Sequence, residues 1–231
     1  MGTIIRGMVE DHQDAELVAC IGSGDADVLA HEVPDADVVI DFSHVSMLPS
    51  VMAYVKRTGA ALVSGTTGYT SEDMDAMRAL CDTAPILYSA NYSVGVAALR
   101  RASVIVAHAL EGFDIEIVEA HHNQKADAPS GTAKMLLDAI NDSQQYTPVY
   151  GRSGMCGKRD PREIGVHAVR GGTVAGVHTV SFFGPDEEVS LTHRASSRAI
   201  FAAGAVSAAF KLVQLPQGWY SFDQVMFGEE D

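Results

Sequence analysis

Short apolar runs alternate with amphipathic stretches through the first ninety residues. Four runs have the length and continuous apolar character of strands buried on both faces, and they lie at 17–21, 38–42, 61–64 and 85–88. Between them, the stretches 46–58 and 71–82 carry apolar residues at helical spacing. Strands that alternate with helices predict a parallel sheet with helices on both faces, which is a doubly wound α/β domain.

The pattern changes after residue 94. A helical stretch at 94–111 leads to a strand at 114–119, and a second helix is expected at 131–142. Three strand-like runs then follow without helices between them, at 164–169, 174–183 and 188–193. Consecutive strands of this kind predict an α+β unit with a mixed sheet. The polar, glycine-rich stretch 141–163 is expected to be a surface loop.

The end of the chain carries a last helical run at 197–213 and a tail at 219–227 that we expect to return to the first domain. The sequence therefore predicts two domains. Residues 1–93 and 202–231 form the first, and residues 94–201 form the second.

Composition narrows the classes of function. The 231 residues carry a formal net charge of −14, which argues against nucleic acid and anionic membrane surfaces as partners. No apolar run is long enough to span a bilayer, and the first residues lack the pattern of a secretory signal. The three cysteines have no metal-binding spacing, and they are expected to be thiols in a reducing cytoplasm.

The richest candidate chemistry lies between the strand at 114–119 and the helix that follows it. His121 can donate a proton near neutral pH, and Lys125 offers a positive charge to a carboxylate. Ser130, Gly131 and Thr132 begin a helix, where hydroxyls and free backbone N–H groups favour an anion. These residues predict a proton donor beside a carboxylate site.

Simpler interpretations exist for the same residues. A histidine is more often a surface or core residue than a catalyst, and Ser-Gly-Thr before a helix often only caps it. The pair His121 and His122 also suggests a metal site. No third histidine or cysteine ligand follows nearby, so we expect no metal.

The string at 119–133, EAHHNQKADAPSGTA, resembles the signature of the 4-hydroxy-tetrahydrodipicolinate reductase (dihydrodipicolinate reductase) family. Further blocks at 39–43, 65–69, 90–95 and 192–198 are similar to family blocks and occur in the family's order. The resemblance implies a Rossmann-like dinucleotide-binding domain at 1–93 and 202–231. It implies a substrate-binding and oligomerisation domain at 94–201.

The resemblance also implies roles for individual residues. His121 would be the proton donor, and Lys125 its partner in catalysis and substrate binding. The other substrate contacts would be His122, Ser130, Gly131, Thr132 and Thr67. The nicotinamide cofactor would lie along Gly65, Thr66 and Thr67, with its pocket closed by Ala90, Asn91 and Tyr92. The last three also have structural interpretations, as two turn residues and a packing aromatic.

The implied reaction is the reduction of 4-hydroxy-tetrahydrodipicolinate, a cyclic dicarboxylate, to tetrahydrodipicolinate in diaminopimelate and lysine biosynthesis. The cofactor would be NADH or NADPH. Asp25 follows the strand at 17–21 too late to bind the adenosine ribose as expected, and no arginine lies near it, so the choice stays open. The resemblance further implies a homotetramer in which strands of the second domain pair between subunits.

The start of the chain departs from the family pattern. A dinucleotide-binding domain begins with a strand and a glycine-rich turn, and here Gly2 resembles the last glycine of that turn. Residues 3–13 would then be the helix. Either the native chain begins about a dozen residues earlier, the length of a short strand and its turn, or the chain is truncated and binds its cofactor weakly.

Two other functions compete with the reductase. One is a different two-domain nicotinamide-dependent dehydrogenase, against which the string at 119–133 argues. The other is a non-catalytic binding subunit of the same fold that has lost its cofactor loop.

Overall fold

The computed structural model describes residues 1–228, and the chain divides into two compact units. Unit 1 combines Met1–Val94 with the chain from Ala199 onward, and unit 2 is Gly95–Arg198. The last three residues of the predicted first domain, 229–231, lie outside the described residues. The α/β class with one parallel and one mixed sheet is confirmed.

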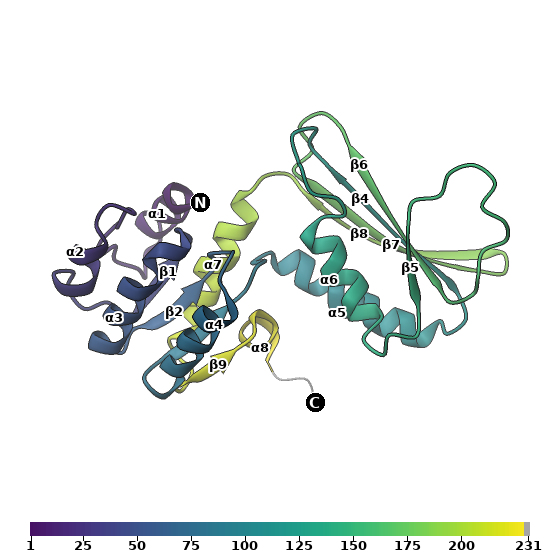
Figure 1. Cartoon of the computed structure of the whole chain (residues 1–231). Helices are drawn as coiled ribbons and strands as arrows, with labels where there is room; N and C mark the ends of the chain where they lie inside the picture. The colour runs from purple at the N-terminus through teal and green to yellow at the C-terminus, as the bar shows by residue number, and fades with distance from the viewer. Residues whose placement is uncertain (229–231) are drawn as a thin grey trace. The chain divides into compact units, whose positions relative to one another are not determined.

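The sheet of unit 1 has four parallel strands in the order β1-β2-β3-β9 (Figure 1). They are β1 (Val38–Asp41), β2 (Ala61–Ser64), β3 (Pro85–Tyr88) and β9 (Gly218–Tyr220). All four residues of β2 are buried, as expected for a central strand covered on both faces. The tail of the chain supplies β9, so its predicted return to the first domain is confirmed.

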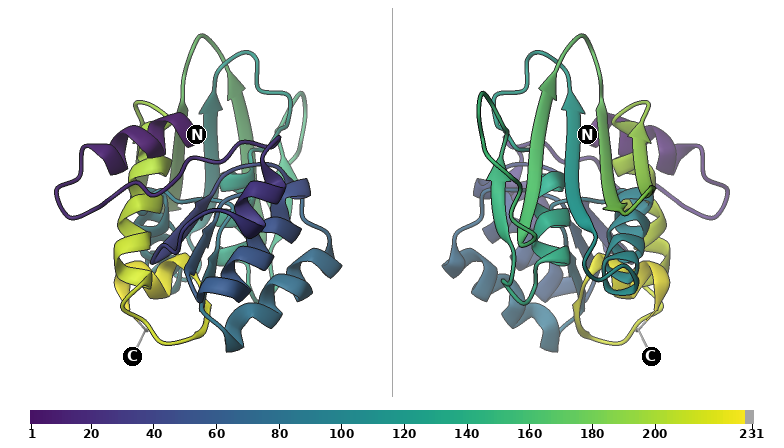
Figure 2. Two further views of the ribbon diagram at one scale, coloured as in Figure 1. Left: turned by 90° about the vertical axis from the view of Figure 1, so that its left-hand side faces the viewer. Right: turned by 90° about the vertical axis from the view of Figure 1, so that its right-hand side faces the viewer.

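Helices cover both faces of this sheet (Figure 2). One face packs against α3 (Leu48–Thr58) and its neighbours, and Leu62 and Ile86 join the same apolar core cluster as Val51 and Tyr54. The other face packs against α7 (Ala199–Leu212). The remaining helical elements of unit 1 are α1 (Gly2–Glu10), α2 (Ala26–His31), η1 (Val45–Met47), α4 (Ser71–Arg78), η2 (Ala79–Asp82) and α8 (Phe222–Phe227).

The predicted strand at 17–21 is wrong. This segment has no regular structure, and most of its residues are exposed. Within residues 1–228, the sheet begins at β1, whose one partner strand is β2. A single extended segment without a neighbouring strand cannot satisfy its backbone N–H and C=O groups, so its apolar sequence alone does not make it a strand.

Unit 2 is a five-stranded mixed sheet in the order β5-β6-β4-β7-β8. Its strands are β4 (Asp114–His121), β5 (Thr147–Tyr150), β6 (Glu163–Arg170), β7 (Gly176–Gly184) and β8 (Glu187–Ala195). One face packs against α5 (Val94–Ala109) and α6 (Gly131–Ile140) around a core that includes Ile117, Leu136 and Phe182. The predicted loop at 141–163 is wrong at 147–150, where β5 adds an edge strand to β6.

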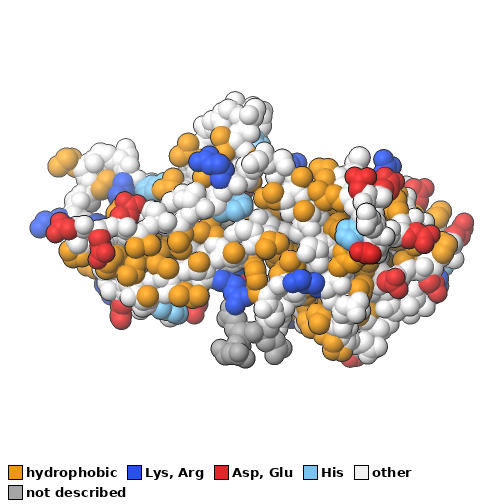
Figure 3. All heavy atoms as spheres, turned by 180° about the vertical axis from the view of Figure 1, so that it is seen from behind, with side chains coloured by type: hydrophobic (Ala, Val, Ile, Leu, Met, Phe, Trp, Pro, Cys, Tyr) orange, Lys and Arg blue, Asp and Glu red, His pale blue; other side chains and the backbone are white. Residues whose placement is uncertain are grey.

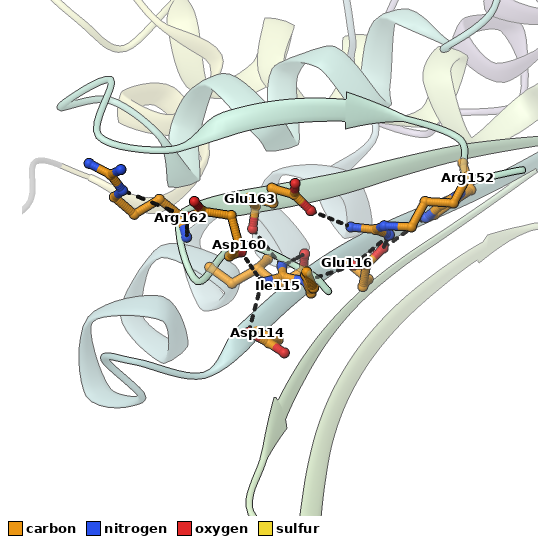
Figure 4. Close-up of polar contacts among 9 residues, drawn as sticks. Asp114, Ile115, Glu116, Arg152, Asp160, Arg162 and Glu163 are labelled. Atoms are coloured by element: carbon orange, nitrogen blue, oxygen red, sulfur yellow. Dashed lines mark hydrogen bonds and ion pairs between the residues drawn. The ribbon is translucent and has the colours of Figure 1, made fainter. Parts of the chain in front are cut away.

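The opposite face of this sheet carries no helix of unit 2 and has a polar cluster of its own (Figure 4). Glu116 accepts hydrogen bonds from Arg152 at 2.9 and 3.0 Å and from Arg159 at 3.3 Å, and it lies 2.7 Å from His167. We call these four residues the Glu116 cluster. Gly165 lies beneath it, because a Cβ there would overlap the Glu116 carboxylate.

Apolar side chains are also exposed on this face of unit 2. Val118, Val169 and Phe183 are 39%, 51% and 39% exposed, and the strand registers put them on the same face as Glu116. Figure 3 shows one face of the molecule, on which apolar side chains form broad areas between scattered charged ones. Among residues 1–228, no helix is long and apolar enough to cross a membrane.

Candidate active site

The predicted proton donor and carboxylate site lie at one end of the sheet of unit 2. β4 and β6 are parallel and end there, and the antiparallel β7 begins there. The loop 122–130 leaves β4 at the same end and leads to the first turn of α6. The topology therefore brings residues of four elements together around the end of β4.

Glu119 is the centre of this end of unit 2. Its side chain is fully buried and its carboxylate accepts four hydrogen bonds. One oxygen, Oε2, receives His121 Nδ1 at 2.6 Å and Arg170 Nη1 at 2.8 Å. The other, Oε1, receives the backbone N–H of Ser130 at 3.0 Å and Arg170 Nη2 at 2.8 Å. Burial favours a higher pKa for Glu119, but the hydrogen bonds from Arg170, His121 and Ser130 outweigh it and lower the pKa.

His121 is the last residue of β4, and its ring is held on two sides. Nδ1 is bound to Glu119, so Nε2 is the nitrogen left for a ligand. The ring of His178 lies edge-on at 5.1 Å between centroids. A Cβ at Gly176 would lie 3.2 Å from Nε2, so a glycine keeps the space beside this nitrogen open. The backbone carbonyl of His121 accepts a hydrogen bond from Gly171.

The first turn of α6 presents backbone N–H groups, as predicted. Ser130 is the N-cap, and its Oγ accepts a hydrogen bond from Ala133 N–H at 3.2 Å. Gly131 is exposed and Thr132 is half-buried, and both follow the cap directly. No atom lies within 4 Å of a Cβ built at Gly131, so this first turn is open to an approaching anion.

Lys125 and His122 lie in the loop between β4 and α6. The Lys125 ammonium pairs with Asp127 Oδ1 at 2.7 Å, and this contact lowers the pKa of Asp127. Arg170 also donates a hydrogen bond to the backbone carbonyl of Asp127, at 2.7 Å. His122 is half-buried, and its carbonyl accepts a hydrogen bond from Lys125 N–H. The structure thus holds the loop that carries both predicted substrate residues.

His178 was not predicted as part of the site. It is 4% exposed, and its Nε2 lies 3.1 Å from Ser130 Oγ. Burial and the neighbouring His121 lower its pKa to about 4, so the ring is neutral at neutral pH. Its Nδ1 has no hydrogen-bond partner among the described residues. The neutral ring of His178 therefore puts no positive charge of its own beside His121.

The predicted cofactor residues of unit 1 lie on two neighbouring loops. Gly65, Thr66 and Thr67 follow β2, and Ala90, Asn91 and Tyr92 follow β3. Because β2 and β3 are adjacent parallel strands, both loops leave the sheet at the same edge. Two further contacts join them: Ser89 N–H donates to the Ser64 carbonyl at 3.1 Å, and Tyr92 Oη donates to the same carbonyl at 2.7 Å. The carboxyl edge of a parallel sheet is where nucleotides bind.

Side chains behind these loops fix their course. Asp41, at the end of β1, is buried and accepts hydrogen bonds from Ser64, Thr66 and Tyr69 at 3.2, 2.9 and 3.0 Å. It also accepts from the backbone N–H and the hydroxyl of Ser43. Thr66 is therefore turned inward to the Asp41 carboxylate, whereas Thr67 is exposed.

Close packing also explains two of the predicted residues. A Cβ at Gly65 would lie 2.4 Å from the Phe42 ring, so only glycine fits between this loop and Phe42. Tyr92 is fully buried and packs against the rings of Phe42 and Phe222. Gly2, the remaining predicted residue, is the first residue of α1, which packs against α7.

The sequence did not identify Glu119, Arg170, His178 and Asp41 as parts of these two sites. Glu119 and His121 continue the alternation of Ile115 and Ile117, and that spacing puts a carboxylate on the buried face. The other three lie far along the chain from the residues they support. Within residues 1–228, the structure contains no group of three or more histidine, cysteine, aspartate or glutamate side chains arranged to hold a metal ion.

Comparisons with known proteins agree over nearly the whole chain. Residues 1–92 match the family described as dihydrodipicolinate reductase, N-terminus, and residues 95–226 match dihydrodipicolinate reductase, C-terminus. The chain is 40% identical over 227 residues to 4-hydroxy-tetrahydrodipicolinate reductase of Exiguobacterium sibiricum, covering 98% of this chain and 89% of that one. It is 44% identical over 195 residues to the enzyme of that name from Staphylococcus aureus strain JH9, covering 84% and 80%.

A solved structure shows the same fold. Dipicolinate-bound dihydrodipicolinate reductase from Paenisporosarcina sp. TG-14 superposes with a TM-score of 0.74 at 21% identity. The match covers 98% of this chain and 95% of that chain.

Proposed function

The chain belongs to the dihydrodipicolinate reductase family, and from this we propose that it is an NAD(P)H-dependent oxidoreductase that converts 4-hydroxy-tetrahydrodipicolinate to tetrahydrodipicolinate. The reaction belongs to diaminopimelate and lysine biosynthesis. One observation supports the assignment of this reaction to particular residues. Glu119 holds His121 by a hydrogen bond at the end of β4, beside the first turn of α6. The proposed proton donor and the proposed anion site are thus neighbours in unit 2.

His121 donates the proton in this proposal. Nδ1 is occupied by Glu119, so the proton leaves from Nε2, whose electrons stay on the ring as the new C–H bond forms. The neutral His178 adds no positive charge of its own beside the ring of His121. A general acid in such a position contributes a rate factor on the order of 100 to 10,000.

The substrate carboxylates bind to the positive groups of the loop and helix. Lys125 exchanges its contact with Asp127 for one with a carboxylate. The N–H groups of Gly131 and Thr132, with the Ser130 cap, receive a carboxylate at the first turn of α6. His122 completes the substrate contacts that unit 2 supplies.

Unit 1 is proposed to bind the nicotinamide cofactor, which supplies the hydride when bound. The loops 65–67 and 90–92 fit this group because they share the carboxyl edge of the sheet and are braced from behind by Asp41 and Tyr92. Gly2, at the start of α1, would lie along the pyrophosphate. Both NADH and NADPH are retained as cofactors. Asp25 is the N-cap of α2, a structural position that does not favour either one.

Self-association as a homotetramer is part of the same proposal. The helix-free face of unit 2 exposes Val118, Val169 and Phe183, and exposed apolar side chains of this kind favour protein contacts. The three free cysteines fit a reducing cytoplasm, and the net charge of −14 fits a protein that binds neither nucleic acid nor membranes.

The test is a spectrophotometric assay that follows loss of NADH or NADPH as 4-hydroxy-tetrahydrodipicolinate is supplied. The chain should turn over with at least one cofactor. His121→Asn should lower kcat by about 100- to 10,000-fold, whereas His108→Asn, at an exposed position on α5, should not. No turnover with either cofactor would support the non-catalytic subunit instead.

A further inference from the structure

A pair of oppositely charged residues lies behind His121, the proposed proton donor. Glu119 and Arg170 touch each other through two hydrogen bonds of 2.8 Å, with one guanidinium nitrogen on each carboxylate oxygen. This bidentate geometry is the most directional ion pair that side chains form. Arg170 comes from the end of β6, which pairs with β4 so that Arg170 lies beside His121.

The remaining hydrogen bonds of Glu119 go to the two functional parts of the site. Oε2 binds the ring of His121 at 2.6 Å, and Oε1 binds the backbone N–H of Ser130 at 3.0 Å. One buried carboxylate therefore holds both the acid and the cap of the helix that presents the anion site. Arg170 adds a further bond, from Nη2 to the backbone carbonyl of Asp127 at 2.7 Å.

The charge state of Glu119 decides which nitrogen of His121 carries a proton. Three of the four groups that reach the carboxylate are donors only: the two guanidinium nitrogens of Arg170 and the Ser130 N–H. They keep Glu119 as an anion, which accepts and cannot donate. Nδ1 of His121 must then be the donor, so the neutral ring carries its hydrogen on Nδ1 and leaves Nε2 as the site that loses and regains the proton.

We propose that Glu119, with Arg170 as its counter-charge, is a positioning residue that fixes the tautomer and the orientation of His121 and aligns the acid with the first turn of α6. This inference rests on the proposed reductase function for its kinetic consequences, but its structural content does not depend on turnover. Arg170 acts through Glu119, and Glu119 acts through His121.

Replacement of Glu119 by glutamine should reverse the tautomer. The carbonyl of the new amide must face Ser130 N–H and Arg170 Nη2, because both are donors. Its NH₂ group then takes the place of Oε2, where it loses the hydrogen bond from Arg170 Nη1 and faces His121 Nδ1. Nδ1 becomes the acceptor, and the proton lies on Nε2. The opposite orientation would set the NH₂ group against two donors, Ser130 N–H and Arg170 Nη2. Glu119→Gln keeps the size of the side chain while changing the one property on which the proposal depends.

The test is nitrogen NMR of the full-length protein labelled at its histidines, recorded at a pH where the rings are neutral. The His121 signals are identified from their loss in His121→Asn. The unaltered chain and Arg170→Lys, which keeps the positive charge, should show the proton on Nδ1. In Glu119→Gln the proton should move to Nε2, and kcat should fall by about 10- to 1,000-fold.

The Glu116 cluster supplies a matched control. Glu116 lies on the same strand and also joins arginine and histidine side chains, among them Arg152 (Figure 4). Because side chains alternate along a strand, it faces the opposite side of the sheet from Glu119. Glu116→Gln should leave the His121 signals unchanged. Circular dichroism and thermal melting identify any variant that fails to fold. If Glu119→Gln fails to fold, Arg170→Met replaces it as the test variant. Arg170→Met should lower kcat more than Arg170→Lys does.

Two results would overturn the proposal. One is an unchanged His121 tautomer in folded Glu119→Gln, and the other is an equal kcat in folded Arg170→Met and the unaltered chain. The NMR result does not need a substrate or a cofactor. A chain that shows no reductase activity but the expected tautomer reversal would therefore contradict the proposed function and leave the positioning role supported.

Discussion

Lys125 is bound to Asp127 at 2.7 Å, and both residues lie in a loop that carries the proposed substrate contacts. A carboxylate that replaces Asp127 would regain a charge-assisted hydrogen bond. Lys125→Met should therefore raise KM for the dicarboxylate by about 10- to 100-fold, the equivalent of one such bond. KM for the nicotinamide cofactor, measured in the same assay, should change little. Equal effects on both constants would contradict the assignment of Lys125 to the substrate.

His178 gives the molecule a specific pH dependence of stability. Burial and then His121 lower its pKa from 6.5 to about 4. Between these values the unfolded chain binds a proton that the folded chain does not, so the free energy of unfolding decreases as the pH falls. His178 should contribute a loss of about 2 kcal/mol between pH 7 and pH 5.

Urea unfolding of the unaltered chain and of His178→Gln at these two pH values measures that contribution. The decrease in the free energy of unfolding should be smaller in His178→Gln, because glutamine does not titrate. Titrating groups that do not interact with His178 affect both proteins alike and cancel in the comparison, whereas the effect of His121 on His178 is part of the measured contribution. An identical decrease in the two proteins would show that His178 takes up its proton as readily when folded as when unfolded.

At the residue scale, the sequence singled out the groups that are proposed to face a ligand and missed the groups that support them. His121, Lys125 and Ser130 lie in one continuous string, so their chemistry could be interpreted locally. Arg170 and His178 reach the same place only because β6 and β7 pair with β4. Pairing between strands that lie so far apart along the chain leaves no local sequence pattern. Arg170 and His178 therefore could not be assigned to the site without the fold.

Among the elements, α4 depends on its first residues. Thr70 Oγ1 accepts a hydrogen bond from Asp73 N–H at 3.1 Å, and Asp73 accepts one from Thr70 N–H at 2.9 Å. This capping box begins the helix directly after the loop 65–69. Thr70→Ala should lower the free energy of unfolding by about 1 kcal/mol, as measured in urea. Thr70→Ser keeps the hydroxyl and should change it much less, and an equal loss in both variants would contradict the role of the cap.

The elements with a strong local pattern were predicted well, and those that depend on a neighbour were not. Amphipathic periodicity was sufficient for α3, α5 and α6. The apolar segment 17–21 forms no strand because the sheet ends at β1, whereas the segment 147–150, within a polar stretch, becomes β5 because β6 offers a free edge. Hydrogen-bond partners, rather than hydrophobicity, decided both cases.

The whole molecule separates its proposed ligands between two units of the chain. NADH should slow amide hydrogen exchange in the loops 65–67 and 90–92 of unit 1, because a bound cofactor restricts local opening. Dipicolinate, a stable cyclic dicarboxylate, should slow exchange at 121–132 in unit 2. Hydrogen-exchange mass spectrometry with each ligand alone measures both effects. Protection of 121–132 by NADH alone, without protection of 65–67, would contradict the division.

The insertion of unit 2 between Val94 and Ala199 sets an order of events during synthesis on the ribosome. Every strand of unit 2 leaves the ribosome before α7 and β9, which unit 1 needs to cover and extend its sheet. Translation adds about 5–20 residues per second, so β2 and β3 of unit 1 stay incompletely covered for several seconds. Unit 1 is therefore the first unit to be synthesised in part and the last to complete its fold. Its apolar strands stay exposed on the nascent chain for the longest time, and a chaperone can bind them during that time.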